Sequence, residues 1–414
     1  MSTIERIELY HVSVPFPQPY YPSWIPGYPQ KHNNFTLARF YTNDGICGVA
    51  AGAAFSRERA GLGDLLGGFL IGARADDLPT LRKRIREASY LGWRNWWLEN
   101  AVWDILGKQA GKPVYKLLQK HEETVERAKV YASTAEVRPI DRRRRYLDTI
   151  RSMGIDAIKI RVKDPQRKDD VTILREVRKE TGDDFVIGVD CNQGWPVSLF
   201  DPTPPWNLEY ATEFGKACDD LGIAWIEEPL FMHDWHGMAK LRRSIATPLS
   251  GAELQGDWHE VLPLFEHESL DIYQPDSTFC GGLTTAARIM DECRSRDLDF
   301  TPHTWTNGIG LLINLHAFAA WEKRERIEFP FEPPGLLPQY REGIIPPVEV
   351  ASDGTIAIPQ EPGLGVNIDE RLLKKYGTRF YVATPLRVAI NTIREKGLRT
   401  ALELRKRKAE SANM

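Results

Sequence analysis

Three carboxylates close three short apolar runs near the middle of this 414-residue chain. The runs are Phe185–Asp190, Ile223–Glu227 and Thr247–Glu253. Short apolar runs bounded by polar turns predict buried strands, and the helical stretches between them predict parallel neighbours. Because the carboxyl ends of parallel strands meet at one edge of a sheet, we expect the three terminal acids to converge.

Three carboxylates in one place need a positive counter-charge, because they repel one another and lose hydration on burial. A divalent cation supplies it, and ligands that are all oxygen favour Mg²⁺ over zinc. The sequence therefore predicts a Mg²⁺ site formed by Asp190, Glu227 and Glu253. Each of them alone is better explained as a helix cap or surface acid, so the interpretation depends on the matching positions of all three. Glu228 points to the other side of its strand.

Two cations occupy the strand predicted at Ala157–Val162. Lys159 and Arg161 are two residues apart, so both side chains lie on the same side of the sheet. Facing a buried interior, they need anions, either the metal-site carboxylates or an anionic substrate. A single lysine of this kind is commonly a surface residue whose stem lies on apolar neighbours, but a pair inside an apolar strand favours a site.

Candidate acid–base residues end the next strands along the chain. Asp276 and His303 end neighbouring strands, so an Asp–His hydrogen bond can form and leave the other ring nitrogen as a general base. A lone histidine is more often a structural residue, and its place at a strand end beside the acids is what favours catalysis. Glu328 ends the last strand; if neutral, it could donate a hydrogen bond to a developing oxyanion, and otherwise it is a surface ion-pair residue.

Regular alternation of strands and helices from Ala128 positions these residues. The strands are predicted at 128–133, 157–162, 185–190, 223–227, 247–253, 270–276, 299–303 and 326–328. Eight strands with helices between them predict an α/β fold of the (β/α)8-barrel type. A doubly wound sheet is the alternative, but no GxGxxG motif follows the first strand.

The ends of the chain predict a second, α+β unit that caps the barrel. Residues 1–54 alternate as a small antiparallel sheet with a turn at Asn43–Gly45, and residues 56–120 have helical spacing. The segment Pro15–Asn34, rich in Pro, Tyr and Trp, is either a lid over a pocket or an oligomer contact. We expect residues 345–367 to rejoin the N-terminal unit. The predicted division is a capping domain at 1–125, a barrel at 126–345 and a returning segment at 346–414.

Composition excludes several classes of protein. A net charge of −3 gives no reason to expect nucleic acid or an anionic membrane as a partner, and there is no 18-residue apolar run. Met1–Tyr10 has no apolar signal core. The five cysteines are scattered and show no CxxC pair. These features predict a cytoplasmic protein with neither a nucleic-acid nor a membrane partner.

Several motifs together resemble those of the enolase superfamily, and within it the mandelate racemase-like acid-sugar dehydratases. Val189–Trp195, Trp225–Pro229 and Ser250–Glu253 are similar to the three metal-ligand motifs of that family. The resemblance extends over nearly the whole chain, through the segments Asn43–Gly48, Ala101–Lys108, Gly111–Tyr115 and Pro362–Gly365. A local insertion, Ser198–Trp206, lengthens the gap between Asp190 and Glu227.

The resemblance implies a role for each matching residue. Asp190, Glu227 and Glu253 would bind Mg²⁺, and Asp276 and His303 would form the base dyad. Glu328 would lie near the substrate carboxylate opposite the metal, while Asn192 and Trp305 match positions that contact substrate. The implied partner is a small sugar-acid substrate, and the implied assembly is a homo-oligomer.

One departure from the family pattern concerns the reaction. Many relatives have a second lysine where this chain has Arg161, and arginine is a poor base because it stays protonated. One good base, His303, favours a reaction on one face of the substrate. The predicted reaction is dehydration of a 2-hydroxy carboxylate to a 2-keto-3-deoxy acid, with Lys159 and Arg161 neutralising negative charge. The loops Pro15–Asn34 and Ala53–Ala60 are expected to set the choice of sugar acid.

Three other functions stay open at this point. An epimerase, racemase or cycloisomerase on the same scaffold needs a second acid or base. A (β/α)8 glycoside hydrolase would use Glu227 or Glu228 with one more carboxylate, but it leaves Lys159 without a role. A non-catalytic binding barrel leaves the pair of Asp276 and His303 without a purpose.

Overall fold

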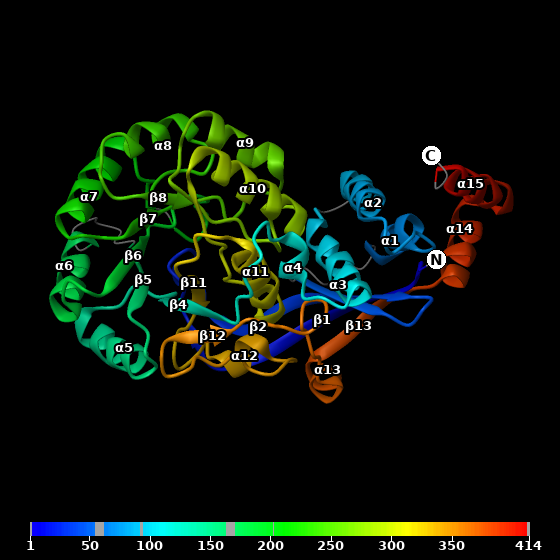
Figure 1. The fold of residues 1–414 in the computed structure, drawn as a ribbon, viewed down its shortest axis with the longest axis horizontal. Helices are drawn as coiled ribbons and strands as arrows, with labels where there is room; N and C mark the ends of the chain where they lie inside the picture. Colours follow the sequence, from blue (N-terminus) through cyan, green and yellow to red (C-terminus); the bar gives the residue numbers. More distant parts are fainter. Residues whose placement is uncertain (1, 54–61, 92–93, 163–169, 202, 412–414) are drawn as a thin grey trace.

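The computed structural model describes residues 2–53, 62–91, 94–162, 170–201 and 203–411. A barrel of alternating strands and helices forms one end of the molecule, and a smaller unit built from both ends of the chain forms the other (Figure 1). This agrees with the predicted α/β fold of the (β/α)8-barrel type with an α+β cap. Within the described residues, no helix is both long and apolar enough to span a membrane. The loop expected at Ala53–Ala60 lies almost wholly outside the described residues.

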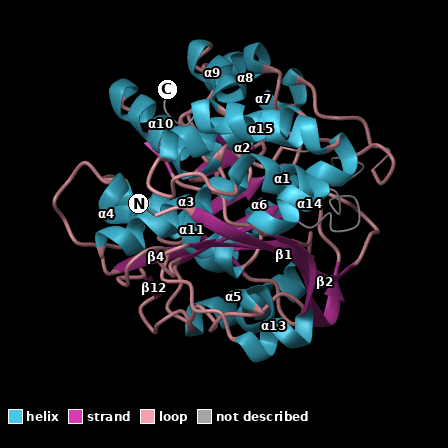
Figure 2. Ribbon diagram, turned by 90° about the vertical axis from the view of Figure 1, so that its right-hand side faces the viewer, coloured by secondary structure: helices cyan, strands magenta, loops and turns pink. Residues whose placement is uncertain are grey.

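The cap contains a four-stranded antiparallel sheet in the order β13-β1-β2-β3. Its strands are β1 (Ile4–Tyr20), β2 (Gln30–Thr42), β3 (Cys47–Ala53) and β13 (Gly377–Ala383). The helices of this unit are α1 (Leu62–Leu70), α2 (Leu78–Tyr90), the 3-10 turn η1 (Trp96–Leu98), α3 (Glu99–Ala110), α4 (Val114–Leu118), α14 (Pro385–Lys396) and α15 (Leu398–Ser411). Figure 2 shows α1, α2, α14 and α15 together on the side of the molecule away from the barrel.

The first hairpin is longer than the sequence indicates. Residues expected in a loop at 15–34 continue the two strands, so that Pro15 pairs with His32 and Tyr20 with Gln30. Prolines are tolerated there because β13 pairs with β1 only between Ile7 and Val12, which leaves the far part of β1 with an open edge. The connecting loop is therefore only residues 21–29.

The barrel contains eight parallel strands, ordered β10-β9-β8-β7-β6-β5-β4-β11. They are β4 (Arg127–Ser133), β5 (Ala157–Arg161), β6 (Val186–Asp190), β7 (Trp225–Glu227), β8 (Leu249–Gly251), β9 (Ile272–Tyr273), β10 (Asp299–Phe300) and β11 (Ile327–Pro330). The ring closes between β10 and β11, where the hydroxyl of Thr304 donates to the carbonyl of Glu328 over 2.9 Å. The strand interiors are buried, which explains their continuous apolar runs.

Helices cover the outside of the barrel and follow the predicted alternation (Figure 1). They are α5 (Ile140–Ser152), α6 (Asp170–Thr181), α7 (Leu208–Asp220), α8 (Trp235–Arg242), α9 (Trp258–Glu266), α10 (Gly282–Arg296) and α11 (Gly308–Ala320). Side-chain caps begin several of them; for example, Asn207 accepts from Tyr210 N at the start of α7. The helix α11 is buried along its whole length, since the cap covers its outer face.

The returning segment contacts the barrel as well as the cap. After α12 (Pro338–Glu342), the strand β12 (Thr355–Ala357) pairs with barrel strand β4, a contact that was not expected for residues 345–367. Contact with the cap does begin in that stretch, where Leu364 N donates to Asp104 of α3 over 2.8 Å. The strand that rejoins the cap sheet is β13, after α13 (Glu370–Tyr376). The division at residues 125 and 345 stays a prediction.

Candidate functional site

The predicted site residues lie at the carboxyl ends of the barrel strands. In the sheet, Arg161 of β5 is opposite Asp190 of β6, and Asp190 is opposite Glu227 of β7. Glu253, Asp276 and His303 follow the ends of β8, β9 and β10 within three residues, and Glu328 lies in β11. Parallel strands end at one rim of a barrel, and this geometry brings side chains distant in sequence together.

Lys159 is at the centre of this group. Its Nζ lies 2.7 Å from Glu227 Oε1, 2.7 Å from Glu328 Oε1 and 3.6 Å from Asp190 Oδ2. The side chain is fully buried. Burial lowers the pKa of Lys159, but Glu227 and Glu328 outweigh it and raise that pKa above its usual range. Lys159 is thus a fixed positive charge.

Arg161 lies beside Lys159 and is covered by two indole rings. It forms an ion pair with Asp190, and its Nη1 lies 3.3 Å from Asn192 Oδ1. The guanidinium carbon is 5.1 Å from the ring centroid of Trp24 and 5.3 Å from that of Trp305. Cation–π contacts with two rings hold the guanidinium plane in one place.

His303 and Asp276 form the predicted pair. Nδ1 of His303 lies 3.0 Å from Asp276 Oδ2, and Nε2 lies 3.2 Å from Glu253 Oε2. Asp276 Oδ1 accepts hydrogen bonds from the backbone and hydroxyl of Thr278 and from Asn314 Nδ2. Burial lowers the pKa of His303, yet the neighbouring carboxylates raise it to about 10. Asp276 therefore fixes one nitrogen while the other points at the acids.

Glu328 differs from the sequence-based interpretation. One of its oxygens accepts from Ser133 Oγ and contacts Lys159, and the other accepts from Thr304 N over 2.7 Å. Burial favours the neutral acid, but Lys159 and His303 hold the pKa of Glu328 well below its usual range. These donors stabilise the anion of Glu328 and so favour the ionised form over the neutral, hydrogen-bond-donating form that the sequence analysis considered.

The acids expected to bind metal are paired with protein cations instead. Among the described residues, no group of three or more His, Cys, Asp or Glu is arranged to hold a metal ion. Asp190 contacts Arg161, Glu227 contacts Lys159, and Glu253 contacts His303 and also accepts a hydrogen bond from Trp195 Nε1. These contacts offset part of the buried negative charge.

The donor chemistry of this group nevertheless suits a hard cation. Glu227 Oε2 and both carboxylate oxygens of Glu228 are buried without a hydrogen-bond partner. Burial raises the pKa of Glu227 to about 8, although Lys159 opposes that rise, and burial together with Glu253 raises the pKa of Glu228 well above its usual range. Orphaned oxygens with raised pKa values show that the anions here exceed the cations, which is the condition that a bound divalent cation relieves.

The hairpin between β1 and β2 covers this end of the barrel. Ser23 Oγ donates to Asn192 Oδ1 over 2.8 Å, and the rings of Trp24 and Trp305 meet edge-on with centroids 5.4 Å apart. Asn192 itself has a positive φ of 47°, and its N–H donates to Asp190. Ser23 and Trp24 both lie in the segment 15–34 that was expected to be a lid or an oligomer contact, but the sequence did not indicate the contact of Ser23 with Asn192, because a contact across 169 residues has no local signal.

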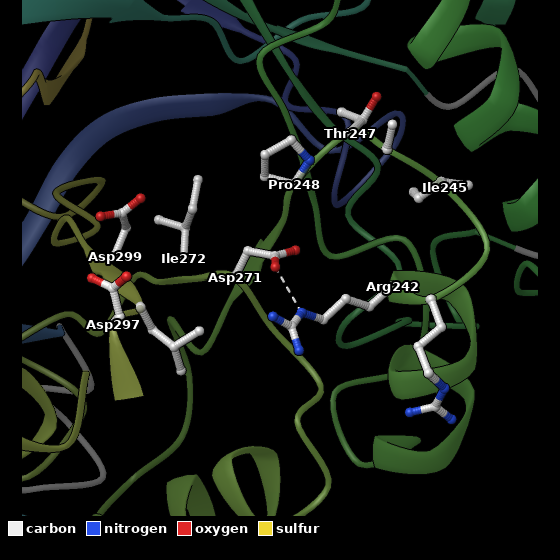
Figure 3. A pocket seen from close by; sticks show the side chains of 11 residues that line it. Arg242, Ile245, Thr247, Pro248, Asp271, Ile272, Asp297 and Asp299 are labelled. Atoms are coloured by element: carbon white, nitrogen blue, oxygen red, sulfur yellow. Dashed lines mark hydrogen bonds and ion pairs between the residues drawn. The ribbon is translucent and has the colours of Figure 1, made fainter. Parts of the chain in front are cut away.

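A separate pocket lies at the opposite end of the barrel, where strands β8 to β10 begin (Figure 3). Two of its charged residues pair with each other: Arg242 Nε lies 2.6 Å from Asp271 Oδ1, and Asp271 Oδ2 accepts a hydrogen bond from Leu249 N. Both members of the ion pair are about one-third exposed. This polar, open pocket has none of the buried, unpaired groups found at the other end.

Comparison with known proteins begins with a family model. The model described as enolase C-terminal domain-like matches residues 142–372, which is more than half of the chain. The matched range includes all the site residues from Lys159 to Glu328. It does not include the hairpin residues Ser23 and Trp24 or Ser133 of β4.

Curated relatives include a dehydratase and a cycloisomerase. L-talarate/galactarate dehydratase of Salmonella typhimurium is 29% identical over 274 residues, which cover 66% of this chain and 63% of that protein. D-galactarolactone cycloisomerase of Agrobacterium fabrum is 26% identical over 291 residues, which cover 67% and 72%. The match thus spans less than two thirds of the length of the first relative.

Solved structures share the fold. The crystal structure of L-talarate/galactarate dehydratase from Salmonella typhimurium superposes with a TM-score of 0.78 at 23% identity, over 92% of this chain and 93% of that one. A racemase from Streptomyces coelicolor with bound magnesium gives a TM-score of 0.77 at 22% identity, over 91% and 100%. The extent of the family match shows that this chain belongs to the enolase C-terminal domain-like family and is an enzyme of the enolase superfamily.

Proposed function

We propose that the protein is a Mg²⁺-dependent dehydratase that converts a sugar acid, a 2-hydroxy carboxylate, to a 2-keto-3-deoxy acid. The observation that carries the proposal is the single base dyad beside buried acids: His303 is 3.0 Å from Asp276, and its other nitrogen is 3.2 Å from Glu253. Similarity to a talarate/galactarate dehydratase supports the same reaction class.

Asp190, Glu227 and Glu253 would hold the Mg²⁺. The orphaned oxygens of Glu227 and Glu228 support this assignment, as does the magnesium in the related racemase structure. Bound there, Mg²⁺ would act as a Lewis acid that polarises the substrate carboxylate and stabilises the negative charge that develops next to it.

The chain's own residues account for the proton transfers. Nε2 of the neutral His303 ring takes the proton from the carbon next to the carboxylate, while Asp276 holds Nδ1 and stabilises the imidazolium that forms. The carboxylates that raise the pKa of His303 to about 10 would hold its proton less strongly once a bound cation offsets their charge. The ammonium of Lys159 stabilises the enediolate, since it is a fixed, buried cation, and Glu328 holds that ammonium in place. The C–O bond to the β-hydroxyl then breaks, the protonated His303 supplies the proton that makes it water, and the enol tautomerises to the ketone.

Arg161, Asn192 and Trp305 are proposed to contact the substrate. Arg161 and Asn192 offer hydrogen bonds to carboxylate or hydroxyl oxygens, and Trp305 offers an apolar face. Their mutual contacts with the hairpin residues Ser23 and Trp24 support a substrate enclosed between hairpin and barrel.

A cycloisomerase or epimerase is the second candidate, since the relatives include a cycloisomerase. Epimerisation needs a second base on the opposite face of the substrate. The residues placed to act there are Lys159 and Arg161, but arginine is a poor base because it stays protonated, and the ammonium of Lys159 is held between Glu227 and Glu328 at 2.7 Å from each. The geometry therefore supports dehydration better.

The test is a screen of the purified protein with Mg²⁺ against a library of acid sugars, with semicarbazide detection of 2-keto-3-deoxy products. A product that disappears on addition of EDTA is the expected outcome. Deuterium incorporation at the α-carbon without a new ketone would instead favour epimerisation, and a ketone that forms equally well in EDTA would contradict the role of the metal.

We also propose a cytoplasmic homo-oligomer. All five cysteines are free thiols, which fits a reducing compartment.

The proposal of a homo-oligomer rests on α14, where Leu386, Ile390 and Ile393 on one face are 71%, 53% and 41% exposed. Residues 385–414 carry eight Lys and Arg against three Asp and Glu, whereas the rest of the chain carries 46 against 54, so a second copy offers an acidic body to this basic segment. Light scattering on the wild type and on Ile390→Glu would test this, with a monomeric wild type as the contradicting result.

A further inference from the structure

The tip of the β1–β2 hairpin reaches the proposed site, but its attachment lies elsewhere. Ser23 and Trp24 contact Asn192 and Arg161 through their side chains. The backbone of the same tip is held by the loop between β4 and α5: Ser23 N donates to Ala135 O over 2.9 Å, and Tyr21 N donates to Glu136 Oε1 over 2.8 Å. The position of the hairpin over the site therefore depends on where this loop lies.

That loop has no regular structure of its own, and a buried carboxylate holds its backbone at two successive residues, while Arg143 Nη2 also donates to Glu136 O over 2.9 Å. Glu332 Oε2 accepts from Ala135 N over 2.6 Å and from Glu136 N over 3.0 Å. Its other oxygen pairs with Arg138 Nη2 at 2.5 Å, and Arg138 also pairs with Glu136. Glu332 is fully buried, and it follows β11 in a short turn closed by mutual backbone hydrogen bonds with Leu336.

The turn that carries Glu332 also packs directly against the hairpin. Leu336 forms a small apolar cluster with Tyr20 and Ala135, to which Trp24 and Trp305 are added at the edge. A side chain at Gly335 would lie 2.8 Å from the carbonyl oxygen of Gln18, so β1 approaches the turn closely there. The carboxylate of Glu332 and the apolar cluster therefore both hold the β4–α5 loop against the hairpin. The hydrogen bonds of Glu332 are the contacts that depend on direction.

We propose that Glu332 is a positioning residue that holds the β4–α5 loop, and through it the β1–β2 hairpin, closed over the site. The inference deepens the proposed function, on which its kinetic consequence rests. Glu332 touches neither the acids nor His303 in the contacts described above, so its effect on turnover is indirect. A carboxylate that accepts hydrogen bonds from two backbone N–H groups and forms an ion pair with an arginine fixes the position of the loop strongly and in one geometry.

The first experiment is hydrogen exchange on Glu332→Ala and Glu332→Gln, which needs no substrate. Loss of the acceptor should raise exchange at the amides of Tyr21 and Ser23 by about tenfold, the equivalent of one hydrogen bond. Amides in the paired base of the hairpin, such as Leu9, should not change. Glutamine keeps one acceptor oxygen, so Glu332→Gln should recover part of the protection. Unchanged exchange at the tip, or an equal increase throughout the barrel, would overturn the proposal.

The second experiment uses the substrate found in the screen. Glu332→Ala should raise KM by about tenfold while kcat changes less, because the hairpin closes over bound substrate rather than taking part in the proton transfer. Glu342→Ala is the matched control, since Glu342 is also fully buried and paired with an arginine, Arg341, but makes none of the contacts with the β4–α5 loop described above. An equal rise in KM in the control would overturn the positioning role. Absence of any turnover in the wild type would contradict the proposed function only, and the exchange result would stand.

Discussion

Two buried histidines, thirteen residues apart, have pKa values that are shifted in opposite directions. His303 lies among carboxylates that include Glu253 and Asp276, and despite its burial they raise its pKa to about 10. His316 lies within α11, where its Nδ1 accepts from Tyr115 N over 3.2 Å, and burial lowers its pKa to about 4. Burial alone thus favours the neutral ring, and neighbouring charge reverses that preference. Only His303 has the surroundings that proton transfer requires.

The largest expected effect comes from removing the charged histidine. His303→Asn should lower kcat on the order of 10⁴-fold, because the proposed base and acid are the same ring. Mg²⁺ binding, measured by titration calorimetry, should persist because the proposed ligands are untouched. His316→Gln is the control, and its folded fraction should keep normal turnover. Full activity in His303→Asn would refute the assigned base.

A smaller loss should follow when the orientation of the ring is disturbed instead. Asp276 accepts hydrogen bonds from Thr278 and Asn314 with one oxygen and contacts Nδ1 of His303 with the other. In Asp276→Asn only one oxygen remains to accept, so the tautomer of His303 is no longer fixed. We expect kcat/KM to fall about 10²-fold to 10³-fold. The measurement is steady-state kinetics with circular dichroism as the check on folding. A loss as small as twofold would mean that Asp276 only packs against the ring.

Much of this contrast was accessible from the sequence. The alternation of apolar runs and helices gives the barrel, and the acids that end those runs mark its rim, because strand period and strand ends are local properties. The position of His303 at a strand end follows from the same pattern. Nothing local marks His316 as different in kind, since the proton affinity of a ring depends on what surrounds it in three dimensions.

The remaining features depend on contacts across long stretches of chain. The ionised state of Glu328 follows from Lys159 and Thr304, and neither pairing has a signal in sequence spacing. The extended hairpin was missed because its prolines suggest a loop, and they are tolerated because β2 pairs with only one edge of the far part of β1, while β13 stops at Val12 and leaves the other edge open. That the acids are paired with protein cations likewise depends on a charge balance that the sequence does not show.

The uncharged histidine should be visible in stability rather than in activity. In the unfolded chain His316 titrates near 6.5, and in the folded protein near 4. Above pH 6.5 both states are neutral and stability is complete; as pH falls from 6.5 towards 4, the unfolded chain takes up the proton first and stability is lost. The loss approaches about 3 kcal/mol. Urea unfolding at pH 7 and pH 4.5 should show a smaller pH dependence in His316→Gln than in the wild type, and identical slopes would contradict the assignment.

The smallest effect on stability and turnover should come from the opposite end of the barrel, where the ion pair of Arg242 and Asp271 is partly exposed to water. Arg242 and Asp271 are 28% and 31% exposed, so water screens the pair and its removal should cost only about 0.5–1 kcal/mol. Arg242→Ala should therefore shift the urea midpoint slightly and leave kcat/KM unchanged. Asp271→Ala should cost more than Arg242→Ala, because Asp271 also accepts from Leu249 N and that backbone donor would lose its partner. If Arg242→Ala instead abolished turnover, the activity would depend on residues at both ends of the barrel. The group of charged residues around His303 would then not be sufficient to explain catalysis.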